Sequence, residues 1–185
     1  MKNTTIIEDL CKTFEKKENV SAEIYNKYRC VLPGELLEIW EKYGFGSLLN
    51  GYLKIIDPDE YVDIANDFYF REIIPVCVTG LGDIIYIEKD QHIGIIRCRK
   101  TKFNIIATSF KWFCECLYDE YYLTKYLEIG EYKEAVRRLG DLEYDECFGY
   151  VPLLGAGGEE KIENLKKVKI KEHIELIYQM FGKVK

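Results

Sequence analysis

Hydrophobic residues recur along this chain with two different spacings. A period near 3.6 residues predicts helices at 5–17, 33–43, 58–68, 110–117, 119–128, 131–139 and 171–182. Short runs rich in Ile and Val predict strands at 52–56, 73–78, 83–88, 93–98, 103–108 and near 165–170. The glycine-punctuated stretch 44–51 is predicted to be a turn, and 141–160 to be irregular.

Residues with capping preferences support several of these boundaries. Pro33 suits the first turn of a helix, and Gly44 follows that helix as a stop. Asp57 can cap the helix that begins at Pro58, and Ser109 can cap the helix predicted over 110–117. The local signals therefore agree with the hydrophobic periodicity.

The four strands between residues 73 and 108 define the fold class. Their connections, at 79–82, 89–92 and 99–102, are too short to hold a crossover helix, so the strands should form an antiparallel meander. Helical segments precede and follow them. The sequence thus predicts an α+β fold, in which a small, mostly antiparallel sheet (strands near 73–78, 83–88, 93–98 and 103–108) has helices packed around it.

Composition narrows the choice of partners. The 185 residues include 26 Lys and Arg against 32 Asp and Glu, a formal net charge of −6. This acidic balance argues against nucleic acid or an anionic membrane as the main partner. No apolar run approaches the roughly 18 residues of a membrane span, and Glu8 and Asp9 stand where an export signal needs apolar residues. We therefore expect a cytoplasmic protein.

The cysteines favour a reducing compartment. Their number, seven, is odd, and no two have the spacing of a zinc knuckle or a redox motif. Several lie in apolar runs, where a free cysteine behaves as a small hydrophobic residue. We expect no disulfide among Cys11, Cys30, Cys77, Cys98, Cys114, Cys116 and Cys147.

Patterns that carry catalytic chemistry are missing from the sequence. None of the three serines lies in a GxSxG motif, and the two histidines, His92 and His173, are far apart. The glycines at 155–158 precede Glu159 and Glu160, whose charges would repel a phosphate. No clustered signature of metal ligands occurs. The sequence therefore predicts no enzymatic activity, no cofactor and no metal; an enzyme with a Cys nucleophile ranks last among the alternatives.

One acidic pattern stands out. Asp59, Asp63 and Asp67 recur every four residues, opposite the apolar face of the predicted 58–68 helix. Like charges at this spacing destabilise a helix by about 0.2–0.5 kcal/mol per pair. The stripe is either a solvated face or an acidic docking surface for a basic partner. In the second interpretation, the later carboxylates Glu143, Asp145 and Glu146 would add to the surface.

Two stretches of the chain resemble known families. The first resembles the N-terminal part of GAD-like domain proteins, on Leu32-Pro33, Ile39-Trp40, Tyr43-Gly44-Phe45-Gly46, Gly51-Tyr52-Leu53 and Asp57-Pro58-Asp59-Glu60-Tyr61, continued by Pro75 and Gly82-Asp83. The second resembles the C-terminal domain of type VI secretion DNase-immunity proteins, on Arg138-Leu139-Gly140, Asp145-Glu146-Cys147-Phe148-Gly149-Tyr150-Val151-Pro152-Leu153-Leu154, Gly157-Gly158, Glu163-Asn164-Leu165, Val168-Lys169 and Glu172-His173. We predict a GAD-like segment over 1–108 and an immunity-type segment over 109–185, which can form one compact unit.

The resemblance implies a bacterial immunity protein, a non-catalytic cytoplasmic binder that neutralises a cognate toxin, in the type member a nuclease. A nuclease must approach a polyanion, so the toxin partner is expected to be basic. The alternative is a regulatory domain that senses a small molecule or a peptide in a pocket between sheet and helices. A deep apolar pocket would favour that alternative.

Overall fold

A computed structural model of the protein describes residues 6–69 and 71–183. Its helices are α1 (Ile6–Leu10), α2 (Ala22–Tyr28), α3 (Gly34–Lys42), α4 (Val62–Phe68), α5 (Phe110–Cys116), α6 (Glu120–Leu127), α7 (Ile129–Leu139) and α8 (Ile170–Phe181). Its strands are β1 (Glu15–Glu18), β2 (Phe45–Leu48), β3 (Leu53–Ile55), β4 (Ile73–Thr79), β5 (Ile84–Glu88), β6 (Ile93–Arg97), β7 (Lys102–Ala107), β8 (Glu146–Tyr150) and β9 (Leu165–Lys169).

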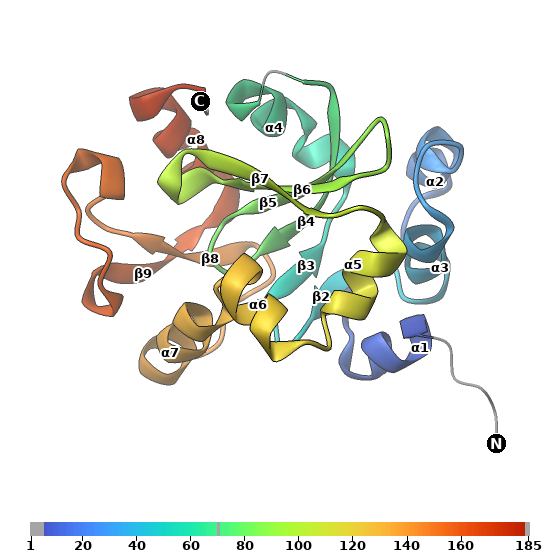
Figure 1. The fold of residues 1–185 in the computed structure, drawn as a ribbon, viewed down its shortest axis with the longest axis horizontal. Helices are drawn as coiled ribbons and strands as arrows, with labels where there is room; N and C mark the ends of the chain where they lie inside the picture. The colour runs from blue at the N-terminus through green and yellow to red at the C-terminus, as the bar shows by residue number, and fades with distance from the viewer. Residues whose placement is uncertain (1–5, 70, 184–185) are drawn as a thin grey trace.

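The main sheet is an antiparallel meander. Seven strands pair in chain order from β1 to β7, and β8 pairs with β9 in a separate antiparallel ribbon (Figure 1). In the β5–β6 pair, for example, Ile84 lies opposite Ile96 and Ile85 opposite Ile95. The predicted α+β class and the predicted meander of four strands, now β4 to β7, are both confirmed.

Helices cover both faces of the main sheet. Cys77 and Ile85 belong to one buried cluster, together with side chains of α3, α5, α6 and α7. Their neighbours Val78 and Ile84 point to the other face and join a second cluster with α4 and α8. Because both faces are buried, these strands read as continuous apolar runs rather than as an alternation.

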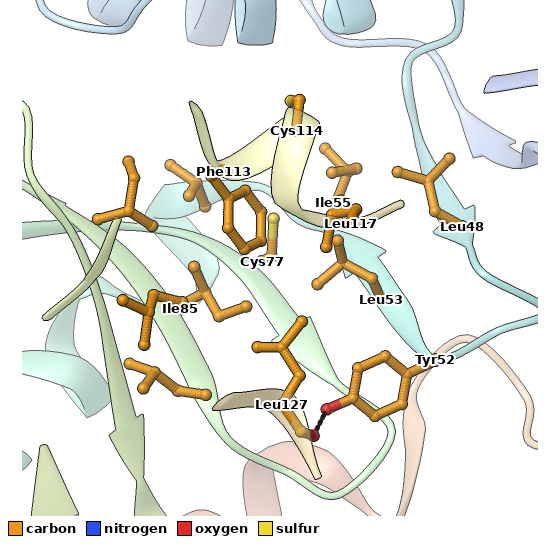
Figure 2. Close-up of a cluster of buried hydrophobic side chains, with 14 of the residues drawn as sticks. Leu48, Tyr52, Leu53, Ile55, Cys77, Ile85, Phe113, Cys114, Leu117 and Leu127 are labelled. Carbon is orange, nitrogen blue, oxygen red and sulfur yellow. Dashed lines mark hydrogen bonds between the residues drawn. The ribbon is translucent and has the colours of Figure 1, made fainter. Parts of the chain in front are cut away.

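The first cluster is closed by contacts between distant parts of the chain. Figure 2 shows Cys77 and Ile85 of the sheet close to Phe113 and Leu117. Phe113 lies on α5, and Leu117 is the residue that caps the end of this helix. The fully buried Tyr52 donates its hydroxyl hydrogen bond to the carbonyl of Leu127 at the end of α6. Tyr52 therefore ties the start of β3 to the helices of the second half of the chain.

The predicted helix over 5–17 is wrong in its second half. Residue 5 lies outside the described residues, α1 and a 3-10 turn cover 6–13, and Glu15–Glu18 forms edge strand β1. All four residues of β1 are exposed, so the strand shows no apolar alternation. An edge strand made of charged residues discourages pairing with other chains. Because β1 contains no apolar residue, the hydrophobic pattern of the sequence does not indicate a strand here.

The predicted turn over 44–51 is also corrected, because residues 45–48 form the buried strand β2. Gly46 allows the backbones of β1 and β2 to approach closely. A Cβ on Gly46 would lie 2.3 Å from the carbonyl oxygen of Glu15, on the strand that pairs with it. Gly46 thus permits the β1–β2 pairing, and only the residues after Leu48 make the turn.

Two elements were not predicted at all. Helix α2 begins after Ser21, whose hydroxyl accepts a hydrogen bond from the backbone N–H of Ile24. Strand β8 lies inside the stretch predicted to be irregular. Four of its five residues are buried, so it presents no alternating pattern. The predicted strand near 165–170 and helix over 171–182 are confirmed as β9 and α8.

Candidate partner-binding surface

The predicted helix over 58–68 consists of two pieces. Asp57 accepts a hydrogen bond from the backbone N–H of Asp59, as its capping role predicts, but it starts a 3-10 turn over Pro58–Glu60. Helix α4 begins only at Val62. Asp59 therefore does not belong to the helix that carries Asp63 and Asp67, and the continuous stripe of three aspartates is not formed.

Asp59 is occupied by contacts inside the molecule. Its carboxylate lies 2.6 Å from Nζ of Lys27 and accepts a 2.5 Å hydrogen bond from the hydroxyl of Tyr28. Burial works against the charged form of Asp59, but the bonds from Lys27 and Tyr28 outweigh it and hold the pKa of this carboxyl below its usual range. Asp59 thus fixes α2 against the turn before α4.

Asp63 and Asp67 are exposed on α4. Neither carboxylate forms an ion pair or a side-chain hydrogen bond with another residue that the structure describes. The two are one helical turn apart and present two uncompensated negative charges. Of the six predicted residues, these two best fit a surface that is open to a partner.

The later carboxylates differ among themselves. Asp145 lies 2.8 Å from Nζ of Lys169, and this hydrogen bond lowers the pKa of Asp145. Glu146 accepts a hydrogen bond of 3.1 Å from the backbone N–H of Glu143 and also lies 3.6 Å from Lys169. The carboxylate of Glu143 is exposed and unpaired among the described residues. Glu143 is thus the most available of the three.

Glu143 and Asp145 line a charged groove, which Asp63 and Asp67 do not reach. The groove has a volume of about 560 Å³ and is also lined by Glu18 of β1 and Glu60 of the 3-10 turn. Lys171 at the start of α8 closes one side by an ion pair of 2.7 Å with Glu60. Of the six predicted residues, Asp63 and Asp67 thus lie on α4, Asp59 lies in the turn before it, and Glu143 and Asp145 line this groove. Glu146, at the start of β8, is not among the residues that line the groove.

A buried lysine supports the groove from below. Lys54 of β3 is 1% exposed, and its ammonium donates to the backbone carbonyls of Glu143, at 3.0 Å, and of Glu146. Burial lowers the pKa of Lys54 to about 8. The hydroxyl of Tyr144 in turn donates to the carbonyl of Ile55 at 2.6 Å. The loop that carries the candidate carboxylates is thus held rigidly on the sheet.

A second ionic cluster was missed by the sequence analysis. Arg99 is 6% exposed, and its guanidinium donates to Asp83 at 3.1 Å, to Glu131 at 3.1 Å and to Glu128. Burial opposes the charged form of Arg99, but these carboxylates outweigh it and raise its pKa. No sequence signal links residues so far apart. The burial of the Arg99 side chain indicates a structural role for this cluster.

Exposed aromatic side chains were also missed. Trp112 on α5 is 51% exposed and Tyr121 on α6 is 65% exposed. Tryptophan and tyrosine are enriched at the energetic centres of protein interfaces. The signal in the sequence was the helical spacing, which places Trp112 off the apolar face formed by Phe110 and Phe113.

Several groups that could act in catalysis or bind a metal are buried or have other partners. Burial raises the pKa of Cys114 and of Cys147 to about 12, which disfavours the nucleophilic thiolate. Glu88, Asp90 and His92 place ligand atoms within 4.8 Å of one another. However, Nδ1 of His92 pairs with Asp90 at 2.7 Å, and Glu88 pairs with Arg71.

The cavities vary in size. The charged groove has a volume of about 560 Å³, whereas a small cavity beside Arg99 has a volume of about 10 Å³. Among the described residues, none of the helices combines the length and the apolar character that crossing a bilayer requires.

Comparison with known proteins agrees with the two stretches recognised in the sequence. Residues 4–86 match the family model of the GAD-like domain, and residues 107–181 match that of the T6SS immunity protein Tdi1, C-terminal. The crystal structure of Atu4351 from Agrobacterium tumefaciens is similar, with a TM-score of 0.71 and 16% sequence identity over 93% of this chain and 88% of that one. At this identity, the likeness establishes the fold. No curated protein matches the chain.

The fold and the two matches together define an α+β protein built from two family segments that pack into one structure. The first segment, residues 4–86, is similar to the GAD-like domain, and the second, residues 107–181, is similar to the C-terminal domain of the T6SS immunity protein Tdi1. Residues 87–106, which neither match covers, complete β5 and supply β6 and β7. They also carry Arg99.

Proposed function

We propose that this protein is a cytoplasmic immunity protein that binds a cognate toxin stoichiometrically and neutralises it without catalysis. The observation that carries the proposal is the match of residues 107–181 to the C-terminal domain of a T6SS immunity protein. The seven cysteines support a reducing compartment, because six are buried free thiols and Cys30 is an exposed one.

The surface chemistry supports a basic toxin, and a nuclease is the proposed class. Asp63, Asp67 and Glu143 offer exposed carboxylates that no described side chain neutralises. A nuclease presents cationic groups to its polyanionic substrate. Carboxylates facing those groups would accelerate association and at the same time block access of nucleic acid.

Affinity capture followed by a growth assay tests the proposal. The purified protein is used as bait in a lysate of the organism that encodes it, at low salt, and bound proteins are identified by mass spectrometry. The captured candidate is then expressed alone and together with this protein. We expect growth arrest in the first case and normal growth in the second. Arrest that persists when both proteins are soluble and abundant would contradict an immunity role.

A second assay tests the absence of catalysis. The isolated protein should not hydrolyse nucleic acid, phosphoesters or peptides. An activity that survives repurification and is lost on substitution of one Cys, His or Asp would show that the protein is an enzyme.

A further inference from the structure

A small cavity beside Arg99 lies where three parts of the chain meet. Arg99 reaches it from the turn after β6, Tyr150 from the end of β8, and His173 from the first turns of α8. Leu153, Ile177 and Phe181 form much of its apolar wall. Its volume of about 10 Å³ leaves room for one water molecule.

Two buried polar atoms of the cavity-lining residues have no hydrogen-bond partner in the described part of the chain. They are Nε of Arg99 and Nε2 of His173. Arg99 is 6% exposed and His173 is 7% exposed, so bulk water does not readily reach them. A buried polar atom without a hydrogen-bond partner destabilises a fold. Because Arg99 and His173 line the same small cavity, a partner inside it would satisfy both atoms.

We propose that a single water molecule occupies this cavity. Its oxygen accepts the hydrogen bond of Arg99 Nε–H, and its two hydrogens are donated to Nε2 of His173 and to the hydroxyl oxygen of Tyr150. The hydroxyl hydrogen of Tyr150 is already donated to Glu131, which leaves its oxygen as an acceptor. The water thereby gains three polar partners, the usual number for a buried water.

Other small occupants fit less well. An anion would be drawn to Arg99, but Asp83, Glu128 and Glu131 already surround this guanidinium with negative charge. A cation would face the donor Nε–H of Arg99. Any organic molecule exceeds the volume. The occupant is therefore a neutral molecule of about the size of water.

The water has a consequence for His173. As an acceptor, Nε2 must be unprotonated, which places the proton of the neutral ring on Nδ1. The ring is also held in position, because a Cβ on Gly149 would lie 2.3 Å from Nε2. The water thus joins the ionic cluster of Arg99 to α8 and fixes the tautomer of the histidine that faces it.

A crystal structure at about 1.5 Å resolution and a nitrogen NMR spectrum of the imidazole rings test the proposal on the unmodified full chain. We expect density for one water within about 3.2 Å of both Nε of Arg99 and Nε2 of His173. In solution, we expect His173 to carry its proton on Nδ1. An empty cavity would overturn the proposal, and so would a proton on Nε2. His92, whose side chain is 40% exposed, serves as the internal reference in the same spectrum.

Discussion

The guanidinium of Arg99 lies 3.1 Å from the carboxylate of Asp83, and both side chains are almost fully buried, at 3% and 2% exposure. Asp83 belongs to the region matched to the GAD-like domain, whereas the other carboxylates around Arg99, on Glu128 and Glu131, belong to the region matched to the immunity domain. One cation thus compensates negative charges from both family segments.

Removal of this cation should be strongly destabilising. We expect Arg99→Met to lower the free energy of unfolding by about 3–5 kcal/mol, because it leaves Asp83 and its neighbours as uncompensated buried charges. Guanidinium denaturation measures the loss. Arg137→Met is the matched control, since the Arg137 side chain is 71% exposed in its pair with Glu134 and should change stability by less than about 1 kcal/mol. Equal effects of the two substitutions would contradict the structural role of Arg99.

The two family segments should unfold together. The contacts of Lys54 with the backbone of Glu143 and Glu146 cross between them. Arg99, which lies between the two segments, bonds to Asp83 of the first and to Glu131 of the second. The two tryptophans report separately, since Trp40 lies in the first segment and Trp112 in the second. We expect the fluorescence transitions of Trp40→Phe and Trp112→Phe each to coincide with loss of helical circular dichroism measured on the same variant. Separate midpoints for the two signals would indicate two independent units.

Protonation of His173 should weaken the fold in mild acid. Burial lowers the pKa of His173 below its ordinary value of 6.5, so the unfolded chain binds this proton more readily than the folded one. Stability due to neutral His173 is therefore present above about pH 6.5 and is lost as the pH falls towards the lower folded pKa. Urea midpoints of the wild type and of His173→Gln, measured from about pH 7.5 down to about pH 5.5, isolate this contribution. The advantage of the wild type should shrink with acidity; an advantage independent of pH would refute the assignment.

Thiol reactivity should separate one cysteine from the other six. Cys30 is exposed, and Cys11, Cys77, Cys98, Cys114, Cys116 and Cys147 are buried. In protein purified without reductant, we expect one thiol to react rapidly in the native state and seven in guanidinium. The substitution Cys30→Ser should abolish the rapid phase. A reproducible count of five or fewer in guanidinium would reveal a disulfide.

Charge reversal on α4 tests the proposed docking surface. Asp63→Lys combined with Asp67→Lys should preserve the fold, because both side chains are exposed and their repulsion is removed. Association with the captured toxin should slow, and the difference should shrink at high salt. Stopped-flow mixing measures the rate.

The matched control for this experiment is Glu115→Lys combined with Glu120→Lys, which makes the same change in net charge on α5 and α6. If the α4 variant associates at the wild-type rate in low salt while the toxin is still neutralised, the docking surface lies elsewhere. The exposed aromatics Trp112 and Tyr121 are then the next residues to substitute.

The sequence predicted those elements whose residues form a recognisable hydrophobic pattern. The strands from β4 to β7 were predicted because Ile-rich runs alternate with connections too short for helices. Strand β1 was not, because all of its residues are exposed and its pairing depends on the missing side chain of Gly46. Strand β8 was not, because its sequence Glu-Cys-Phe-Gly-Tyr contains neither Ile nor Val and shows no alternation.

The candidate site was predictable only as far as local spacing determines it. Asp63 and Asp67 lie one helical turn apart, as their spacing predicted. Their separation from Asp59 depends on the turn before α4 and on Lys27, which lies 32 positions earlier in the chain. The division at residue 108 stays a prediction. Contacts between distant residues, such as those of Lys54 and Arg99, leave no mark in a single sequence.

The strictly sequential pairing of β1 to β7 has a consequence for synthesis. Each strand joins the one translated immediately before it, so the sheet can grow in step with the ribosome without waiting for distant partners. The second face of that sheet, with Val78, Ile84 and Ile96, obtains its cover from α8 only when residues 170–181 have emerged. Until then, α4 alone covers this face, and part of its apolar surface stays exposed in the nascent chain.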